Sequence, residues 1–83
     1  MNMTAIIMFQ PFVLEQVILV YQNGNLVDTR REQIDRIPSV LAELSSHYSL
    51  SNIQLIGNQD YLGRFQNEIR STVPTTVDIN ILK

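Results

Sequence analysis

The pair Asn23-Gly24 constrains the fold of this chain more than any other feature of its sequence. It separates an apolar run, Val17 to Tyr21, from a more polar run, Leu26 to Arg31. Asn and Gly both tolerate positive φ, which the two-residue turn of a β-hairpin requires. The pattern therefore predicts a β-hairpin whose first strand covers Val13 to Tyr21.

The two strands of this hairpin differ in their pattern, and a third apolar run precedes them. Val17 to Tyr21 does not alternate with polar residues, which is typical of a central strand covered on both faces. The polarity of Leu26 to Arg31 favours an outer position. The run Thr4 to Phe9 is β-branched and apolar and is followed by Pro11. It predicts either an edge strand or an N-terminal arm.

The first helix has two candidate starts. Thr29 and Glu32 have the spacing of a capping box, but a helix that began there would contain Pro38 in its interior. With Asp35 as N-cap, Pro38 falls in the first turn, where its missing N–H costs nothing. We prefer this second start, with the helix ending near Tyr48. It aligns an apolar stripe at helical spacing, formed by Ile37, Val40, Leu41, Leu44 and Tyr48.

The remaining sequence predicts a strand, a helix and a strand. Ile53 to Gly57 is a short apolar run, and Asn58 is suited to cap the helix that follows. Thr76 to Leu82 alternates between apolar and polar residues, as a half-buried strand does. The predicted fold class is α/β: one domain over residues 1–83, with a small mixed sheet, two helices and the order (β)ββαβαβ. With so few helices, one sheet face is expected to be poorly covered, and such a face usually implies a partner.

Composition excludes several classes of function. The net charge of −2 provides no basic surface, so nucleic acid is not expected as a partner. There is no cysteine, which excludes disulfides and thiolate catalysis. The apolar N-terminal region is interrupted by polar residues and has no positively charged start, so neither a membrane span nor a signal peptide is expected. We expect a cytoplasmic protein without a cofactor.

One junction has the residues of a ligand site. Gly57, Asn58 and Asp60 lie where a strand meets a helix, and ligands of parallel α/β units bind beyond the carboxyl ends of strands. The same residues are also those of an ordinary helix start. His47 is the single histidine, and a triad sketched from it with nearby serines has no geometric support in sequence. The acidic residues are spread along polar positions, so no metal site is expected.

The stretch Ile53 to Leu62 resembles the fourth strand and following helix of ribonuclease H-like domains, and the order of elements is similar as well. The resemblance implies that fold. Catalysis in that superfamily is two-metal phosphodiester cleavage by several carboxylates. Its first-strand acid would lie within Val17 to Tyr21, where no acidic residue stands. Asn58 occupies the place of a further Asp, and Asp60 is two positions late. The resemblance therefore supports the fold and argues against a nuclease.

Three functions follow as hypotheses. The first is a non-catalytic interaction or assembly module, of the kind found among small bacterial or phage accessory proteins. The second is a degenerate ribonuclease H-like nuclease or nucleotide-binding domain that uses Asn58 and Asp60. The third is a small ligand-binding regulator with its site in a dimer groove. Because the N-terminal apolar run exceeds what an edge segment can bury, we expect a homo-oligomer, or a complex with another protein, with Ile7, Phe9 and Phe12 at the interface.

Overall fold

The structure is a computed structural model and describes residues 3–82. It forms five strands and two α-helices in the predicted order, with a short 3-10 turn before the first helix. Within residues 3–82, no helix has the length and apolar character needed to cross a membrane. The elements are β1 (Met3–Met8), β2 (Glu15–Gln22), β3 (Asn25–Gln33), η1 (Ile34–Arg36), α1 (Ile37–Tyr48), β4 (Asn52–Ile56), α2 (Gln59–Arg70) and β5 (Asp78–Leu82).

The strands form one mixed sheet in the order β3-β2-β1-β4-β5. Strands β1, β4 and β5 are parallel to one another, while β2 and β3 are antiparallel to their neighbours. The predicted fold class is confirmed, but the place of the first strand is corrected. β1 is neither an edge strand nor an arm. It lies at the centre because Ile7 pairs with Ile18 of β2 on one side and with Leu55 of β4 on the other.

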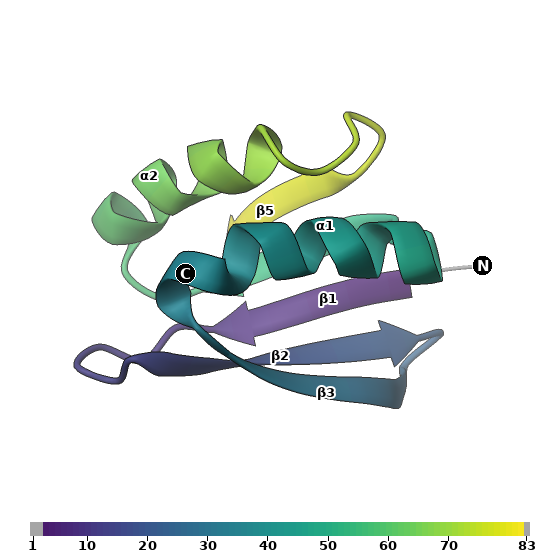
Figure 1. Cartoon of the computed structure of the whole chain (residues 1–83), viewed down its shortest axis with the longest axis horizontal. Helices are drawn as coiled ribbons and strands as arrows, with labels where there is room; N and C mark the ends of the chain where they lie inside the picture. The colour runs from purple at the N-terminus through teal and green to yellow at the C-terminus, as the bar shows by residue number, and fades with distance from the viewer. Residues whose placement is uncertain (1–2, 83) are drawn as a thin grey trace.

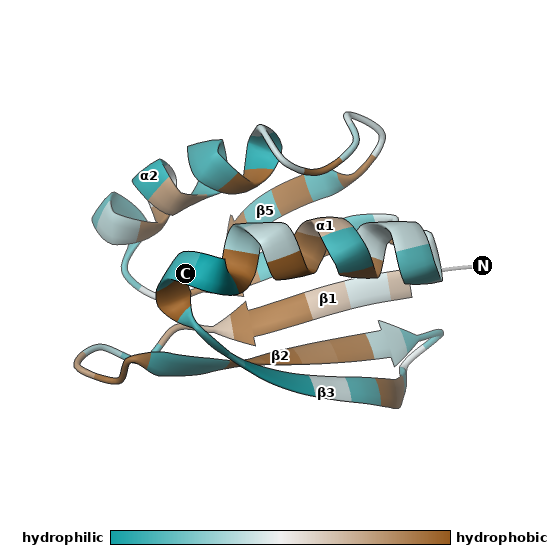
Figure 2. Cartoon of the chain, in the orientation of Figure 1, coloured by the Kyte–Doolittle hydropathy of each residue, from teal (hydrophilic) through white to brown (hydrophobic). Residues whose placement is uncertain are grey.

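Both helices lie on the same face of the sheet and close a single core (Figure 1). Alternate residues of β1 (Met3, Ala5 and Ile7) point toward the helices and are buried. The apolar stripes of the helices meet them, and Figure 2 shows β1 and most of β2 as apolar, whereas the outer strand β3 is largely polar. The buried helix residues are Ile37, Val40, Leu41, Leu44, Leu62, Phe65 and Ile69.

No described helix covers the second face of the sheet. Ile18 and Val20 of β2 face the helices and are buried, whereas Val17 and Leu19 face away and are only half-buried. The expectation that both faces of Val17 to Tyr21 are covered is therefore wrong, because both crossover helices pack on one side. We call the second side the open face. Its apolar members are Ile6, Met8, Val17, Leu19, Tyr21, Ile56 and Leu82.

The start of α1 differs in detail from the prediction. Pro38 does lie in the first turn, but Asp35 is not the N-cap. The 3-10 turn Ile34–Arg36 comes first, and Arg36 occupies the cap position without a side-chain bond to the helix. The helix ends at Tyr48, followed by Ser49 in the left-handed conformation.

The hairpin turn lies where the sequence predicts it. Asn23 has a φ of 51° and Gly24 a φ of 86°, so both central residues are in the left-handed region that a tight two-residue turn needs. β3 pairs only with β2 and is an outer strand, as expected.

Replacing the turn glycine should therefore destabilise the fold. We expect Gly24→Val to lower the free energy of unfolding by about 1–2 kcal/mol, because a β-branched residue is strained at positive φ. Gly63→Ala in α2 is the control, since an added Cβ there meets nothing within 4 Å. This control should raise stability by about 0.5–1 kcal/mol through helix propensity. Urea denaturation measures both, and an unchanged midpoint for Gly24→Val would contradict the assigned turn.

Candidate functional site

The predicted strand-to-helix junction forms as expected around Asn58. Its Oδ1 accepts hydrogen bonds from the backbone N–H groups of Asp60, at 3.0 Å, and Tyr61, at 3.2 Å. Asn58 is therefore the N-cap of α2, and its side chain retains Nδ2 as a donor for any further partner. Gly57 precedes it with a φ of 152°, and a Cβ there would lie 3.4 Å from the Cβ of Phe9. This close approach joins the end of β4 to the end of β1.

A pocket of about 550 Å³ opens at this junction. Two of its walls are aromatic: the rings of Phe9 and Tyr61 meet edge to face, with centroids 6.1 Å apart. The pocket lies where β1 and β4 end and α2 begins, which is the usual ligand position in parallel α/β sheets. Most of its lining residues are apolar and none is charged, which suits an uncharged apolar group. The lining residues are Phe9, Gln10, Pro11, Ile34, Gly57, Asn58 and Tyr61.

Two of the three predicted junction residues line this pocket. Gly57 and Asn58 do, but the exposed Asp60 does not. Sequence reasoning missed Pro11, which it treated only as the end of a strand. It also did not assign Tyr61 to the junction, and this side chain is 48% exposed and lines the pocket. Only the pairing of β1 with β4 brings the loop after β1 against the start of α2, so no local signal identifies these walls.

The loop between β1 and β2 is held by one buried side chain. Gln16 is only 2% exposed, and its Oε1 accepts from the Gln10 backbone N–H at 2.9 Å. Its Nε2 donates to the carbonyl oxygens of Gln10, at 3.0 Å, and Val13, at 2.7 Å. These three bonds fix a loop with a fully exposed Phe12 at positive φ, 65°. Positive φ is rare for an aromatic residue and costs energy, so the surrounding bonds stabilise an unfavourable local conformation.

The predicted interface residues divide between core and surface. Ile7 is fully buried and Phe9 is 9% exposed, so both belong to the core of the chain and neither is available as an exposed contact. The physical reason is the central place of β1, which packs this strand against both helices instead of leaving it at an edge. Phe12 is exposed, as the interface hypothesis requires.

Exposed apolar side chains gather at the end of the molecule where the parallel strands finish. Figure 1 shows the β1–β2 loop and the start of α2 at this same end. Only Leu26 and Val27, among the large exposed apolar residues described, lie elsewhere, at the β2–β3 hairpin. We call the gathered set the apolar edge: Met8, Phe12, Val13, Leu14, Tyr61 and Leu82. Exposed apolar side chains that gather at one end of a domain, as these do, point to a contact site.

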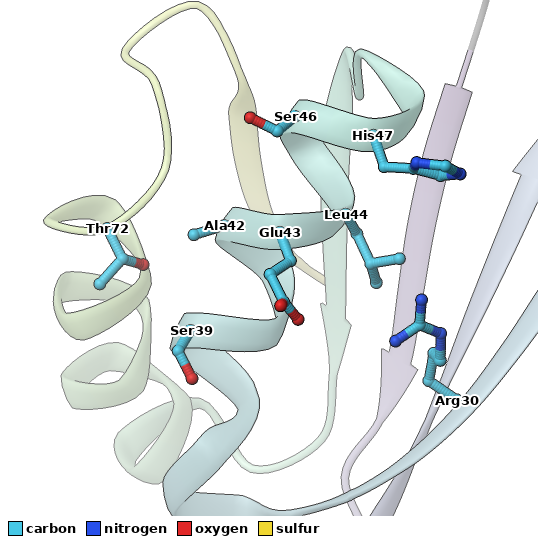
Figure 3. Close-up of a pocket in the computed structure, with 8 residues that line it drawn as sticks. All are labelled: Arg30, Ser39, Ala42, Glu43, Leu44, Ser46, His47 and Thr72. Atoms are coloured by element: carbon cyan, nitrogen blue, oxygen red, sulfur yellow. The ribbon is translucent and has the colours of Figure 1, made fainter.

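A larger hollow, of about 920 Å³, lies along the outer side of α1 and carries His47 and Glu43 (Figure 3). It is wide and open, and its side chains do not converge. Figure 3 shows Ser46 and His47 pointing away from each other, and the Ser45 hydroxyl donates to the carbonyl of Ala42, so the sketched triad does not form. In addition, Thr72 Oγ1 already donates to the carbonyl of Pro38. Within residues 3–82, no three acidic or histidine side chains cluster to hold a metal ion.

A polar network closes the helix side of β3. Tyr48 Oη donates to Asp28 Oδ2 at 2.8 Å, the Thr29 backbone N–H donates to Asp28 Oδ1 at 2.8 Å, and Arg30 Nε lies 3.5 Å from Asp28 Oδ2. The hydrogen bond from Tyr48 is the main cause that lowers the pKa of Asp28 below 3.8. The same bond raises the pKa of Tyr48. The network joins the end of α1 to the outer strand.

This lowered pKa predicts an acid-dependent loss of stability. A carboxylate with a lower pKa in the folded chain stabilises it above its unfolded pKa, near 3.8, and this contribution disappears as the pH falls through the folded pKa. Denaturation measured from pH 6 to pH 2 should therefore show a smaller decline for Asp28→Asn than for the wild type. Tyr48→Phe, which keeps the carboxylate but removes its main partner, should reduce the decline as well. If the free energy of unfolding declined equally with pH in all three proteins, the stabilising role assigned to the bond between Asp28 and Tyr48 would be wrong.

Comparison with known proteins finds similarity in structure alone. The chain matches no protein-family model and no curated protein. A Bacteroides thetaiotaomicron protein of unknown function with an actin-like ATPase fold superposes with a TM-score of 0.72 and 10% identity, over 98% of this chain and 32% of that one. The type II variant of the Aquifex aeolicus Ppx/GppA phosphatase gives a TM-score of 0.56 and 12% identity, over 98% and 36%.

These similarities establish the fold. It is a small mixed α/β fold, a five-stranded mixed sheet with two helices, and it is compatible with the actin-like ATPase type of fold. The predicted ribonuclease H-like outline is compatible with it, as a related but not identical fold. The chain spans about a third of the length of either protein. At such identities the comparison bears on architecture only, so any function has to be argued from this chain's own surfaces.

Proposed function

We propose that this chain is a non-catalytic assembly module that self-associates through the apolar edge. The observation that carries the proposal is the concentration there of six of the eight large exposed apolar side chains described. Burying one large apolar side chain contributes about 1.5–3 kcal/mol. A few of these residues buried together supply a substantial part of the free energy of association, against the cost of fixing two chains.

The catalytic alternative rests on Asn58 and Asp60, and the geometry favours it less. Asn58 Oδ1 already accepts two backbone hydrogen bonds, and the Asp60 carboxylate is outside the pocket wall. β1, which is the true first strand, has the sequence MTAIIM and supplies no carboxylate. Two-metal phosphodiester cleavage needs several carboxylates directed at one point. The lack of a carboxylate in β1 therefore argues against a nuclease, and we favour an interaction domain.

The oligomeric state tests the proposal. Light scattering at micromolar concentration should give the wild type a mass that is a multiple of 9.5 kDa. Met8→Ser combined with Leu14→Ser should shift this mass toward one chain, since both residues belong to the apolar edge. The matched control is Leu26→Ser with Val27→Ser, which changes two other exposed apolar residues at the opposite hairpin and should leave the mass unchanged. A wild type with the mass of one chain overturns the proposal.

A further inference from the structure

We propose that Phe12 of one copy inserts into the junction pocket of a second copy, while the second copy's Phe12 enters the pocket of the first. The inference rests on the proposed self-association and specifies its contact. Each chain would contribute one aromatic knob and one hole. The knob is Phe12, and the hole is the pocket walled by Phe9, Pro11, Ile34 and Tyr61.

The loop that carries Phe12 is already fixed in the single chain. Phe12 is fully exposed and makes no described contact that would bury its ring. Its loop is nevertheless ordered by the three hydrogen bonds of Gln16, a side chain that lies in the interior. A loop already fixed in its bound conformation loses little entropy on association, which favours binding. Displaying an aromatic ring at positive φ has a cost, and such strain is concentrated at functional sites.

The hole suits an aromatic ring by its chemistry. Phe9 and Tyr61 present two rings that meet edge to face, and an inserted ring would extend this arrangement. Tyr61 is 48% exposed in the single chain, so insertion would bury surface that is now in water. Gln10 and Asn58 add polar residues to the apolar lining, and protein interfaces combine apolar and polar groups in the same way.

The knob and hole are adjacent on one surface, as a two-fold symmetric contact requires. In such a contact the same patch of both subunits must be complementary to itself. Pro11 lines the hole and Phe12 is the next residue, so the two features share one small area. A two-fold axis beside Pro11 would bring each knob to the opposite hole. If the knob and the hole lay on opposite sides of the folded domain, copies would instead join head to tail into an open filament.

Charge at this surface also favours a second copy. Residues 9–14 and the pocket lining contain no charged side chain, so two copies meet without like-charge repulsion in a chain of net charge −2. The adjoining hollow shares Ile34 and Tyr61 with the pocket, and its charged lining residues are Asp35, Arg64 and Glu68. Because this hollow contains charges of both signs, Arg64 of one copy can pair with an acidic side chain of the other across the axis.

A complementation experiment tests the exchange. Phe12→Ser removes the knob, and Tyr61→Ser removes a wall of the hole; both residues are exposed, so both variants should fold, which circular dichroism checks. Sedimentation equilibrium should show that each variant alone has a dissociation constant raised at least about tenfold over the wild type. Mixed together, the two variants should associate more tightly than either does alone. The Tyr61→Ser chain still has its knob, and the Phe12→Ser chain still has its hole.

The outcomes separate this inference from the proposed function. A wild type that is monomeric overturns both. A wild type that associates, with Phe12→Ser and Tyr61→Ser unaffected, overturns the exchange but leaves self-association in place. Weaker association of each variant without recovery in the mixture also overturns the exchange, because it shows that both residues contribute without contacting each other across the axis. Leu26→Ser is the matched control and should associate as the wild type does.

Discussion

Ile7→Ala is expected to lower the free energy of unfolding by about 2–5 kcal/mol, the range for truncating a buried aliphatic side chain. Ile7 is fully buried in the central strand and pairs with Ile18 and Leu55 on its two sides. Since small domains have a total stability of about 5–15 kcal/mol, this one change removes a large part of it. Urea denaturation followed by circular dichroism measures the loss.

Ile6→Ala is the matched control for this prediction. It changes the same residue type in the same strand, but Ile6 faces the open side of the sheet and is half-buried. The free energy of unfolding should fall by less than about 2 kcal/mol, because the side chain of Ile6 is already partly in contact with water and its truncation removes less buried surface. Equal losses for the two variants would mean that both faces of β1 are covered in solution, and would contradict the one-sided packing of the helices.

Gln16→Leu is expected to destabilise the fold by about 1–3 kcal/mol and to loosen the loop between β1 and β2. Leucine keeps most of the side-chain volume but removes the three hydrogen bonds to Gln10 and Val13. The backbone groups that lose their partners must turn to water, which requires the loop to open. Denaturation gives the free energy, and hydrogen exchange of the Gln10 amide reports the loop directly.

Gln33→Leu controls for the change from amide to apolar side chain. Gln33 is exposed at the end of the outer strand, so its replacement should alter stability by less than about 0.5 kcal/mol. The Gln10 backbone amide is expected to exchange faster in Gln16→Leu than in the wild type. In Gln33→Leu it should exchange at the wild-type rate. A Gln10 amide that remains protected in Gln16→Leu would show that the loop is held by something else. The fixed and exposed position of Phe12 would then need another explanation.

Local patterns were enough to predict most elements of this fold. The Asn23-Gly24 turn needs only two residues that tolerate positive φ, and Asn58 needs only the backbone N–H groups two and three positions later. The clean alternation before Leu82 predicted β5 in the same way. These features depend on neighbours in sequence, so the sequence carries their signal directly.

The start of α1 shows where local reasoning was insufficient. Asp35 is a good N-cap residue, and yet it lies inside a 3-10 turn. The backbone N–H of Ile34 donates to the carbonyl of Leu14 across the sheet end, which ties the start of this turn to the β1–β2 loop. Ile34 and Leu14 are 20 positions apart in sequence. Their contact accompanies a start of α1 that capping preference alone does not predict.

By itself the sequence determined the order of strands and helices, the hairpin, the cap of α2 and the lack of a carboxylate in the apolar strands. Only the tertiary structure decided that β1 lies at the centre of the sheet, which buries Ile7 and Phe9 and leaves Phe12 exposed. An apolar run has the same pattern at an edge, in an arm or in the middle of a sheet. Which of these it occupies depends on pairing with distant strands, and that pairing also builds the pocket beside Phe12.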